Sequence, residues 1–298
     1  MSAPTGAGEG PAVLAMMRFG AGGTTLGHEL ADPASPQLEV MDLAATRGDG
    51  VFETISIGGG HTQALEPHLR RFAYSAALLD LPAPDLDAWR AAVQAVAAEL
   101  GPVDEGFVKI VLTRGVEGGD RPTGWAFAAP SPDHTPARTT GIRIVLLDRG
   151  YRHDVAQTSP WLLAGAKTLS YAVNRSAFRE AARLGADDAL FVSSDGYLLE
   201  GAVSTLVLRR GKHLSTPRTD LGILEGTTQQ DIFGFAEREG FTTSYDLLTA
   251  EDLASADAAW LVSSVRHAAA VRAVDGVERP VDRDFSDAIN AFLRARTE

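Results

Sequence analysis

The chain has 298 residues, of which 45% are hydrophobic, so it is long enough to form two domains and to bury a large core. A total of 27 basic against 39 acidic residues gives a net charge of -12, which argues against nucleic acid or an anionic membrane surface as the main partner. The absence of cysteine excludes disulfides and thiolate metal sites and fits a reducing interior, so we expect a cytoplasmic protein. The first apolar stretch is short and is followed by Arg18, so no signal peptide and no membrane span are predicted.

The N-terminal segment predicts a tail followed by strands. Residues 1–11 are rich in Gly, Pro, Ala and Ser, and we expect them to be mobile. Short strands are predicted at residues 13–19 and 38–42. Residues 51–57 alternate apolar and polar side chains, reach a run of three glycines and resume at residues 61–65, which indicates a hairpin.

Two amphipathic helices are predicted next. Pro67 suits the first turn of one helix, in which apolar residues recur at steps of three and four. On this helix His68, Arg71 and Ser75 share a different face. The second helix covers residues 86–100, with the same kind of apolar spacing, and a Gly-Pro pair stops it.

The remaining pattern predicts two domains. Strands at residues 107–113 and 125–129 complete a first α+β unit. Residues 131–140 contain two prolines and several small polar residues, and within this stretch we place the linker at residues 135–140. The expected N-terminal α+β domain is residues 1–134, and the expected C-terminal domain is residues 141–298.

The second half alternates strands and helices. A β-branched apolar run is followed by a helix that reaches Gly185, and two hairpins come next. The predicted strands are residues 142–147, 189–192, 197–199, 205–208 and 213–216.

Lys167 is the first candidate for chemistry. It closes a small-residue turn before an amphipathic helix, where packing can desolvate its amine. A desolvated amine loses its charge more easily and becomes a nucleophile. On this segment alone, a solvated surface lysine is the alternative.

Two later segments are candidates for ligand binding. Glu200 ends an apolar run and precedes Gly201, where a carboxylate can pair with a protonated ring nitrogen; an exposed turn residue is the alternative. Residues 224–231 hold a loop glycine, two threonines and then a helical pattern, and the N–H groups of such a helix start can bind phosphate. Thr228 and Asp231 have the spacing of a capping box, so a plain N-cap is the alternative.

The order of these segments resembles the class IV family of pyridoxal-phosphate enzymes. The blocks that match are residues 48–54 (the family's GDG(V/C)F pattern), 68–72 (HxxRL), 167–170 (the Schiff-base lysine), 200–201 (E-G) and 226–228 (G-I-T-R). The resemblance implies an α/β (α+β) fold with a smaller N-terminal α+β domain and a larger C-terminal pseudo-barrel domain. It also implies a homodimer that acts on a small molecule.

Carried over residue by residue, the resemblance implies pyridoxal 5'-phosphate as the cofactor, with Lys167 as its Schiff-base lysine. Glu200 is expected to pair with the pyridinium nitrogen, which strengthens the electron sink of the ring. The other cofactor-binding residues that it implies are Arg71, Thr227, Thr228 and Ser264 at the phosphate, with Thr205 behind them. Gln229 departs from the arginine that the family usually has at this position.

The segment that distinguishes reactions is residues 107–115. It is similar to the pattern of the lyase that converts 4-amino-4-deoxychorismate to 4-aminobenzoate and pyruvate, with Lys109 where branched-chain transaminases have arginine. A lysine point charge and a nearby arginine suit an anionic substrate with two carboxylates. The expected substrate contacts are Lys109, Arg121, Arg266 and Phe52.

The lyase is the predicted function, with Lys167 acting first as nucleophile and then as general base. The first alternative is a D-amino-acid or branched-chain aminotransferase of the same family. The second is a non-catalytic protein that has kept the fold. A Lys109 side chain on the solvent face of its strand would weaken the case for the lyase.

Overall fold

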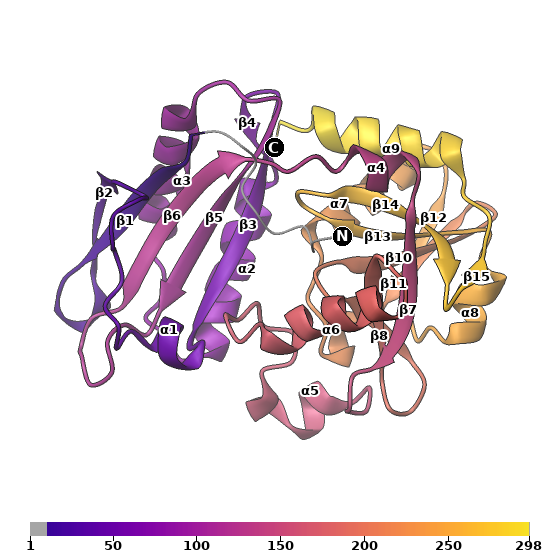
Figure 1. Cartoon of the computed structure of the whole chain (residues 1–298), viewed down its shortest axis with the longest axis horizontal. Coiled ribbons are helices and arrows are strands. Elements are labelled where there is room, and N and C mark those ends of the chain that lie inside the picture. Colours follow the sequence, from indigo (N-terminus) through magenta and orange to yellow (C-terminus); the bar gives the residue numbers. More distant parts are fainter. Residues whose placement is uncertain (1–10, 298) are drawn as a thin grey trace. The chain divides into compact units, whose positions relative to one another are not determined.

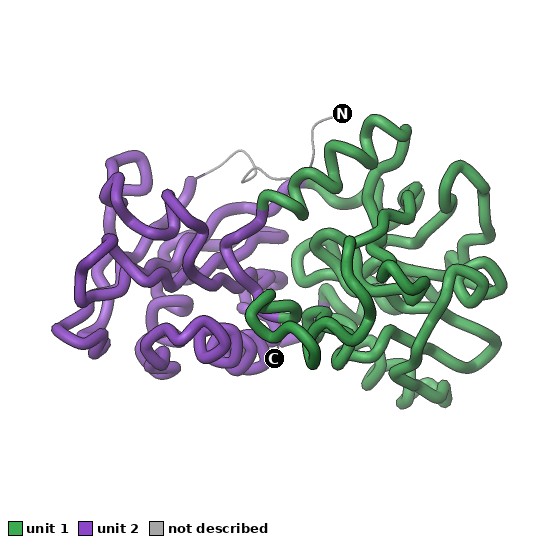
Figure 2. The backbone as a smooth tube through the Cα atoms, turned by 90° about the horizontal axis from the view of Figure 1, so that it is seen from below, with its two compact units in different colours: residues 1–3, 133–165, 172–294 green, residues 4–132, 166–171, 295–298 purple. Residues whose placement is uncertain are grey.

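The computed structural model describes residues 11–297, which divide into two compact units (Figure 2). The N-terminal unit comprises residues 11–132, 166–171 and 295–297, and the C-terminal unit comprises residues 133–165 and 172–294. Residues 166–171, which include Lys167, thus belong to the N-terminal unit although their sequence neighbours belong to the other one. Two units that each combine helices with sheet confirm the predicted fold class.

The ends of the predicted domains differ in detail from these units. The predicted tail, residues 1–11, lies outside the described residues except for Pro11. The predicted linker, residues 135–140, contains the helix α4 (Thr135–Thr139), whose first turn holds Pro136. Proline is favoured there because its φ is already helical and its missing N–H has no helical partner to lose.

A six-stranded antiparallel sheet forms the N-terminal unit, in the spatial order β2-β1-β6-β5-β3-β4 (Figure 1). Its strands are β1 (Val13–Phe19), β2 (Thr25–Ala31), β3 (Gly50–Gly58), β4 (His61–Thr62), β5 (Glu105–Thr113) and β6 (Thr123–Pro130). The predicted strand at residues 38–42 is wrong. Asp42 instead caps the helix α1 (Leu43–Arg47), and its Oδ1 accepts a hydrogen bond from Ala44 N at 2.8 Å. The sequence did not reveal β2, because few of its side chains are buried on either face.

The predicted pair of helices, α2 (Leu65–Leu78) and α3 (Leu86–Leu100), packs on the sheet of this unit. Their apolar stripes are buried as the spacing predicted, and Phe72 meets Trp89 edge-on with ring centroids 4.9 Å apart. Asp85 caps α3 by accepting hydrogen bonds from Asp87 N and Ala88 N. Burial of these stripes fixes which face of α2 points at β3.

A nine-stranded mixed sheet forms the C-terminal unit, with β15 pairing beside β14 and the other strands in the order β12-β11-β10-β13-β14-β7-β8-β9. Its strands are β7 (Ile142–Asp148), β8 (Asp188–Val192), β9 (Leu198–Gly201), β10 (Thr205–Arg210), β11 (His213–Pro217), β12 (Thr242–Asp246), β13 (Ala258–Ser263), β14 (His267–Val274) and β15 (Val277–Glu278). The two predicted hairpins are β8–β9 and β10–β11. The central strands β13 and β14 were not predicted.

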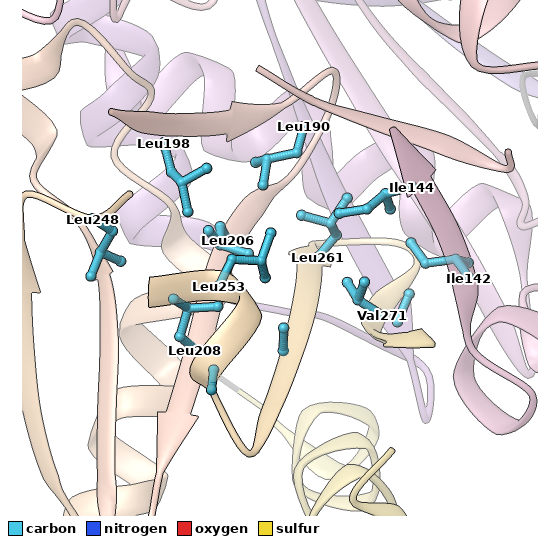
Figure 3. Packing of buried hydrophobic residues seen from close by; sticks show 13 residues of the cluster. Ile142, Ile144, Leu190, Leu198, Leu206, Leu208, Leu248, Leu253, Leu261 and Val271 are labelled. Carbon is cyan, nitrogen blue, oxygen red and sulfur yellow. The ribbon is translucent and has the colours of Figure 1, made fainter. Parts of the chain in front are cut away.

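Alternate residues of β10 enter two separate cores. Leu206 and Leu208 join a cluster to which β7, β8, β9, β13 and β14 also contribute, so one core gathers side chains from strands far apart in the sheet order (Figure 3). Val207 points to the other side and packs with Trp260 in a second cluster beneath α7 and α9. A sheet that is apolar on both faces in this way is covered on both.

The helices of this unit are mostly short. Besides α4, they are α5 (Val155–Thr158), α6 (Ala172–Arg183), α7 (Thr227–Arg238), α8 (Ala250–Ser255) and α9 (Arg283–Ala295). Thr249 and Asp252 form a reciprocal capping box at the start of α8. Within residues 11–297, no helix combines the length and the apolar character that a membrane span needs.

The loop between β5 and β6 allows a matched test of backbone strain. Gly115 and Gly118 both have positive φ, of 90° and 79°. A Cβ on Gly115 would lie 2.0 Å from the Arg121 carbonyl oxygen, whereas a Cβ on Gly118 would meet open space. We expect Gly118→Ala to lower the free energy of unfolding by about 1–2 kcal/mol, through φ alone. Gly115→Ala should lower the free energy of unfolding by about 1–3 kcal/mol more than Gly118→Ala does, because the Arg121 carbonyl must move. Urea unfolding of both variants measures this, and equal costs would contradict the placement of Arg121.

Candidate active site

The backbone of Lys167 is held by two elements of the N-terminal unit. Its carbonyl accepts a hydrogen bond from Phe52 N on β3 at 3.0 Å, and its N–H donates to Ser75 Oγ on α2 at 3.1 Å. Leu169 N donates to Gly50 O at 2.8 Å, which extends the pairing along β3. The segment 166–171 therefore continues the sheet beside the first half of β3, and the position of Lys167 is set by that strand and α2.

The Lys167 amine lies against an aromatic ring. Its Nζ is 4.6 Å from the centroid of Phe52, and the Phe52 ring packs edge-on against Tyr171 with centroids 5.4 Å apart. The ring excludes water from one side of the amine and attracts its charged form through the π face. The structure thus brings together two of the predicted site residues, the nucleophile and a predicted substrate contact.

Three charged or polar side chains form a buried cluster behind β3. Glu53 is fully buried and accepts hydrogen bonds from Arg71 Nε and Nη2, both at 2.7 Å, in a bidentate pair. His68 Nδ1 lies 2.7 Å from Glu53 Oε2. The face of α2 that the spacing grouped as His68, Arg71 and Ser75 therefore points at β3 and at Lys167. Arg71 is the predicted phosphate ligand, and that role stays a prediction.

The cluster fixes the ionisation of Glu53 and His68. Burial alone would raise the pKa of Glu53, but the charge and hydrogen bonds of Arg71, with those of His68, hold that pKa well below its usual range. Burial lowers the pKa of His68, and this outweighs the opposite effect of Glu53. The ionised carboxylate can only accept, so neutral His68 carries its proton on Nδ1 and donates it to Glu53.

Lys109 lies on the sheet face that carries Phe52. In the register of the sheet, Thr54 pairs with Lys109 and Lys109 pairs with Phe127. Cross-strand partners point to the same side and alternate residues share a face, so Phe52, Lys109 and Phe127 project from one face. Phe107 lies on it as well, 6.2 Å from Phe127 between ring centroids. The Lys109 side chain is exposed, and desolvation by its surroundings lowers the pKa of its amine.

Glu200 lies at the end of β9 in the C-terminal unit. Its Oε2 accepts a hydrogen bond from Leu224 N at 3.1 Å, which fixes the carboxylate to the loop before α7. Its negative charge contributes to raising the pKa of Tyr151, chiefly an effect of burial, so the Tyr151 hydroxyl lies close to it. The carboxylate is partly buried. The Glu200 carboxylate is therefore oriented by a backbone N–H. The alternative, an exposed turn residue, does not describe it.

The start of α7 is packed against the start of β10. A Cβ on Gly226 would lie 2.4 Å from Thr205 Oγ1, so only glycine allows this approach. Gly226 itself is the N-cap residue, and within the described chain no side chain caps the helix. The capping-box alternative for Thr228 and Asp231 is wrong, because the helix begins at Thr227 and places Thr228 inside its first turn.

The hydroxyl of Thr228 is buried and, among the described residues, has no hydrogen-bond partner. The same holds for Ser204 Oγ, in the turn before β10. An unmet buried hydroxyl costs about 1–3 kcal/mol, so such groups commonly receive a ligand. Together with the N–H groups and the positive dipole end of the helix, the Thr228 hydroxyl provides donors suited to a phosphate. This observation fits the predicted roles of Thr227 and Thr228.

The turn between β13 and β14 contains two further predicted site residues. Ser264 follows β13, close to the start of β10, because Thr205 pairs with Val262. Arg266 is buried, and its Nη1 donates to Asp188 Oδ2 at 2.7 Å. Arg138 donates to the carbonyls of Val265 and Arg266 and so fixes the shape of the turn. Arg266 thus forms a buried ion pair inside its own unit, and a substrate contact by it stays a prediction.

The structure also shows the surroundings of Gln229 and Arg121. Gln229, at the family's usual arginine position, is buried and donates to Tyr245 Oη at 3.2 Å. Gln229 therefore connects α7 to β12 through this hydrogen bond. Arg121 is largely exposed in the β5–β6 loop, with its Nε 3.7 Å from Asp120 Oδ1.

The pattern of the amino-transferase class IV family matches residues 50–274, which is most of the chain. The chain belongs to the class IV aminotransferase family. This membership confirms the family resemblance, and with it pyridoxal phosphate as the cofactor that the resemblance implied.

Three similar proteins illustrate the relationship. A bifunctional aminodeoxychorismate lyase / D-amino acid transaminase from Mycobacterium tuberculosis is 42% identical over 282 residues, which is 90% of this chain and 98% of that protein. A fold IV transaminase from Curtobacterium pusillum is 53% identical, with a TM-score of 0.92 over 96% of this chain and 98% of that one. A hypothetical aminotransferase from M. tuberculosis, in an α-ketoglutarate and PMP bound form, is 42% identical, with a TM-score of 0.86 over 90% and 96% of the two chains.

The sequence of β3 contains a signal for Glu53 in its apolar alternation. Val51, Ile55 and Ile57 occupy the apolar phase of β3, and Glu53 interrupts it. A carboxylate in a buried phase needs a paired cation. Arg71 on the following helix was therefore the natural partner to expect, and His68 lies one turn before it.

The low pKa of His68 predicts a pH dependence of stability. The unfolded chain binds a proton at His68 as the pH falls below about 6.5, while the folded chain resists protonation. Since the unfolded state then binds more protons, stability falls as the pH drops from 7.5 through about 6.5 and below. We expect His68→Gln to flatten this slope in urea unfolding of the cofactor-free protein. His61→Gln, at an exposed position in β4, should keep the wild-type slope; an equal slope in all three proteins would contradict the assignment.

Proposed function

We propose that the protein is a pyridoxal-phosphate-dependent 4-amino-4-deoxychorismate lyase that forms 4-aminobenzoate and pyruvate. The observation that carries this proposal is the position of Lys109, on the same sheet face as Phe52, whose ring contacts the Lys167 amine. The similarity to a relative named for this lyase activity and for D-amino acid transamination supports it.

The residues of each unit fit the cofactor that they are proposed to hold. The phosphate suits the first turn of α7, where the Thr228 hydroxyl lacks a partner within the described chain, with Thr227 and Ser264 as further donors. Thr205 lies behind Gly226 and keeps that turn in place. Arg71 is the proposed cation for the phosphate, Lys167 the covalent attachment, and Glu200 the partner of the ring nitrogen.

When bound, the cofactor supplies an electron sink that stabilises negative charge at a substrate carbon. The Lys167 amine would hold the cofactor covalently, and when free its Nζ would take a proton from the substrate ring. Glu200, held by Leu224 N, would keep a proton on the ring nitrogen. Cleavage of the C–O bond between the ring and the enolpyruvyl group would then leave an aromatic ring, and Lys167 would return its proton to the departing enolate, which becomes pyruvate.

The substrate has a flat ring with carboxylates, and the sheet face offers a matching surface. Phe52, Phe107 and Phe127 provide aromatic area for the ring. Lys109 provides an exposed cation beside this aromatic surface, where it can pair with a substrate carboxylate. Arg121 and Arg266 complete the proposed substrate contacts, although the ion pair with Asp188 makes Arg266 the weaker of the two.

Transamination of D-amino acids is the second candidate function. The bifunctional relative carries this activity in its name, and the similar M. tuberculosis aminotransferase is described in a form that binds α-ketoglutarate, an oxo acid, and PMP. A branched-chain substrate is the less favoured version, because Lys109 replaces the arginine of that group. In both versions the same Lys167 would move a proton between two carbons.

A cytoplasmic homodimer is part of the same proposal. Large apolar side chains are exposed in the N-terminal unit, on β2 and in the loop that follows it. They are Leu26, Leu30, Leu38, Val40 and Met41. A cluster of this kind on one unit is suited to cover by a second copy of the chain.

Product analysis tests the reaction. Purified holoprotein with aminodeoxychorismate should release 4-aminobenzoate and pyruvate in equal amounts, and Lys167→Ala should slow this by at least about 10²- to 10⁴-fold, because the nucleophile and base are lost. Lys212→Ala, in the exposed β10–β11 turn, is the control and should act as wild type. Rapid exchange between D-alanine and α-ketoglutarate without 4-aminobenzoate would refute the lyase, and absence of both reactions would favour the non-catalytic alternative.

The role of Lys109 is tested separately. Lys109→Gln removes a charge-assisted contact worth about 1.5–3 kcal/mol, so kcat/KM for the lyase reaction should fall by about 10- to 100-fold. The affinity for pyridoxal phosphate should not change. Lys212→Gln serves as the matched control. An unchanged kcat/KM in Lys109→Gln would show that the Lys109 side chain does not contact the substrate.

A further inference from the structure

We propose that Glu53 is a positioning residue that holds the Arg71 guanidinium in the orientation needed to bind the cofactor phosphate. This inference rests on the proposed function, in which Arg71 is the phosphate cation. Glu53 touches neither the phosphate nor the reacting atoms; it acts through Arg71.

The ion pair between Glu53 and Arg71 is buried and bidentate. Glu53 is fully buried, and the Arg71 side chain is 10% exposed. Two parallel hydrogen bonds of 2.7 Å engage the Nε–Nη2 edge of the guanidinium. Since the group is planar, this edge determines the plane and turns the Nη1 side away from the carboxylate.

His68 fixes the carboxylate in turn. Its Nδ1 is 2.7 Å from Glu53 Oε2 and 3.4 Å from Arg71 Nη2, so the three side chains form a closed cluster between β3 and α2. His68 is 1% exposed on its side chain and neutral, so it adds a donor without adding charge. Glu53 therefore has only one counter-ion in this cluster, and rotation of its carboxylate would break contacts on both oxygens.

Two physical effects of Glu53 oppose each other. Its charge partly neutralises Arg71, which weakens attraction to a phosphate. Its hydrogen bonds remove the rotamer freedom of a long side chain before the ligand arrives, which strengthens binding. Buried arginine without a partner also pays a large desolvation cost. We infer that orientation outweighs neutralisation, so removal of the carboxylate weakens phosphate binding.

The same strand positions the other end of the cofactor. Phe52, the neighbour of Glu53, donates its N–H to the carbonyl of Lys167. Successive residues of β3 thus hold the covalent attachment on one side and the phosphate cation on the other.

The test compares a ligand that has the phosphate with one that lacks it. Glu53→Gln keeps the shape of the side chain but loses its charge. We expect the Kd of the cofactor-free protein for pyridoxal phosphate to rise by about 10- to 100-fold. The Kd for pyridoxal, which has no phosphate, should stay within about twofold. Glu66→Gln is the matched control, because Glu66 lies on α2 and pairs with Arg90 in an exposed bidentate contact; it should leave both values unchanged.

A double-mutant cycle shows whether Glu53 acts through Arg71. In the Arg71→Lys background, Glu53→Gln should cause no further loss of pyridoxal phosphate affinity, because a lysine cannot form the bidentate hydrogen bonds that orient the guanidinium. If Glu53→Gln does not fold, Glu53→Asp, which keeps the charge but retracts it, should produce a smaller loss of the same selectivity.

The inference is overturned if Glu53→Gln binds pyridoxal phosphate as well as or better than wild type, or loses affinity for both ligands equally. Wild-type protein that binds pyridoxal phosphate no better than pyridoxal would overturn both this inference and the proposed function. If Glu53→Gln loses affinity for pyridoxal phosphate but not for pyridoxal, and the wild-type protein forms no 4-aminobenzoate, the inference is supported and only the lyase is refuted.

Discussion

The candidate site residues of the N-terminal unit depend on the alternation of β3. Val51, Glu53 and Ile55 point to one face and Phe52 and Thr54 to the other, as the period of a strand requires. Because β3 is paired with β5 along its whole length, its register is fixed, and a slip by one residue would exchange the two sets. The buried carboxylate reinforces this register, since the slipped strand would move Glu53 away from Arg71. The same strand also fixes the backbone of Lys167, whose carbonyl accepts the hydrogen bond of Phe52 N.

The candidate residues of the C-terminal unit are held by a close backbone approach and a backbone hydrogen bond, and a buried ion pair lies in the neighbouring turn. Gly226 lies against Thr205, and Glu200 is held by Leu224 N, so the ends of β9 and β10 meet the start of α7. Arg138 and the Asp188–Arg266 pair brace the neighbouring turn from below. Among the described residues, the buried Thr228 hydroxyl in this region has no hydrogen-bond partner, which costs stability and is consistent with the proposed phosphate site.

Local patterns were sufficient to predict α2, α3 and the hairpins β8–β9 and β10–β11, because their apolar spacing matches one periodicity over many residues. Prediction failed where tertiary context decides. Residues 38–42 look like a strand, yet Asp42 caps α1; Thr228 and Asp231 look like a capping box, yet Gly226 begins α7. Glu53 was overlooked because its partners lie on another element. Family resemblance predicts site residues in order along the chain, while the contacts that each of them makes within its unit required the fold.

The attachment of residues 166–171 to β3 has a consequence for how the chain can be divided. A fragment that ended at residue 132 would contain six strands and both large helices, yet the first half of β3 would be an open sheet edge with unpaired backbone groups. Such an edge invites association with other strands. The fragment would also lack the lysine. Neither unit is therefore a contiguous stretch of sequence, and a cut between residues 132 and 133 would leave both pieces incomplete.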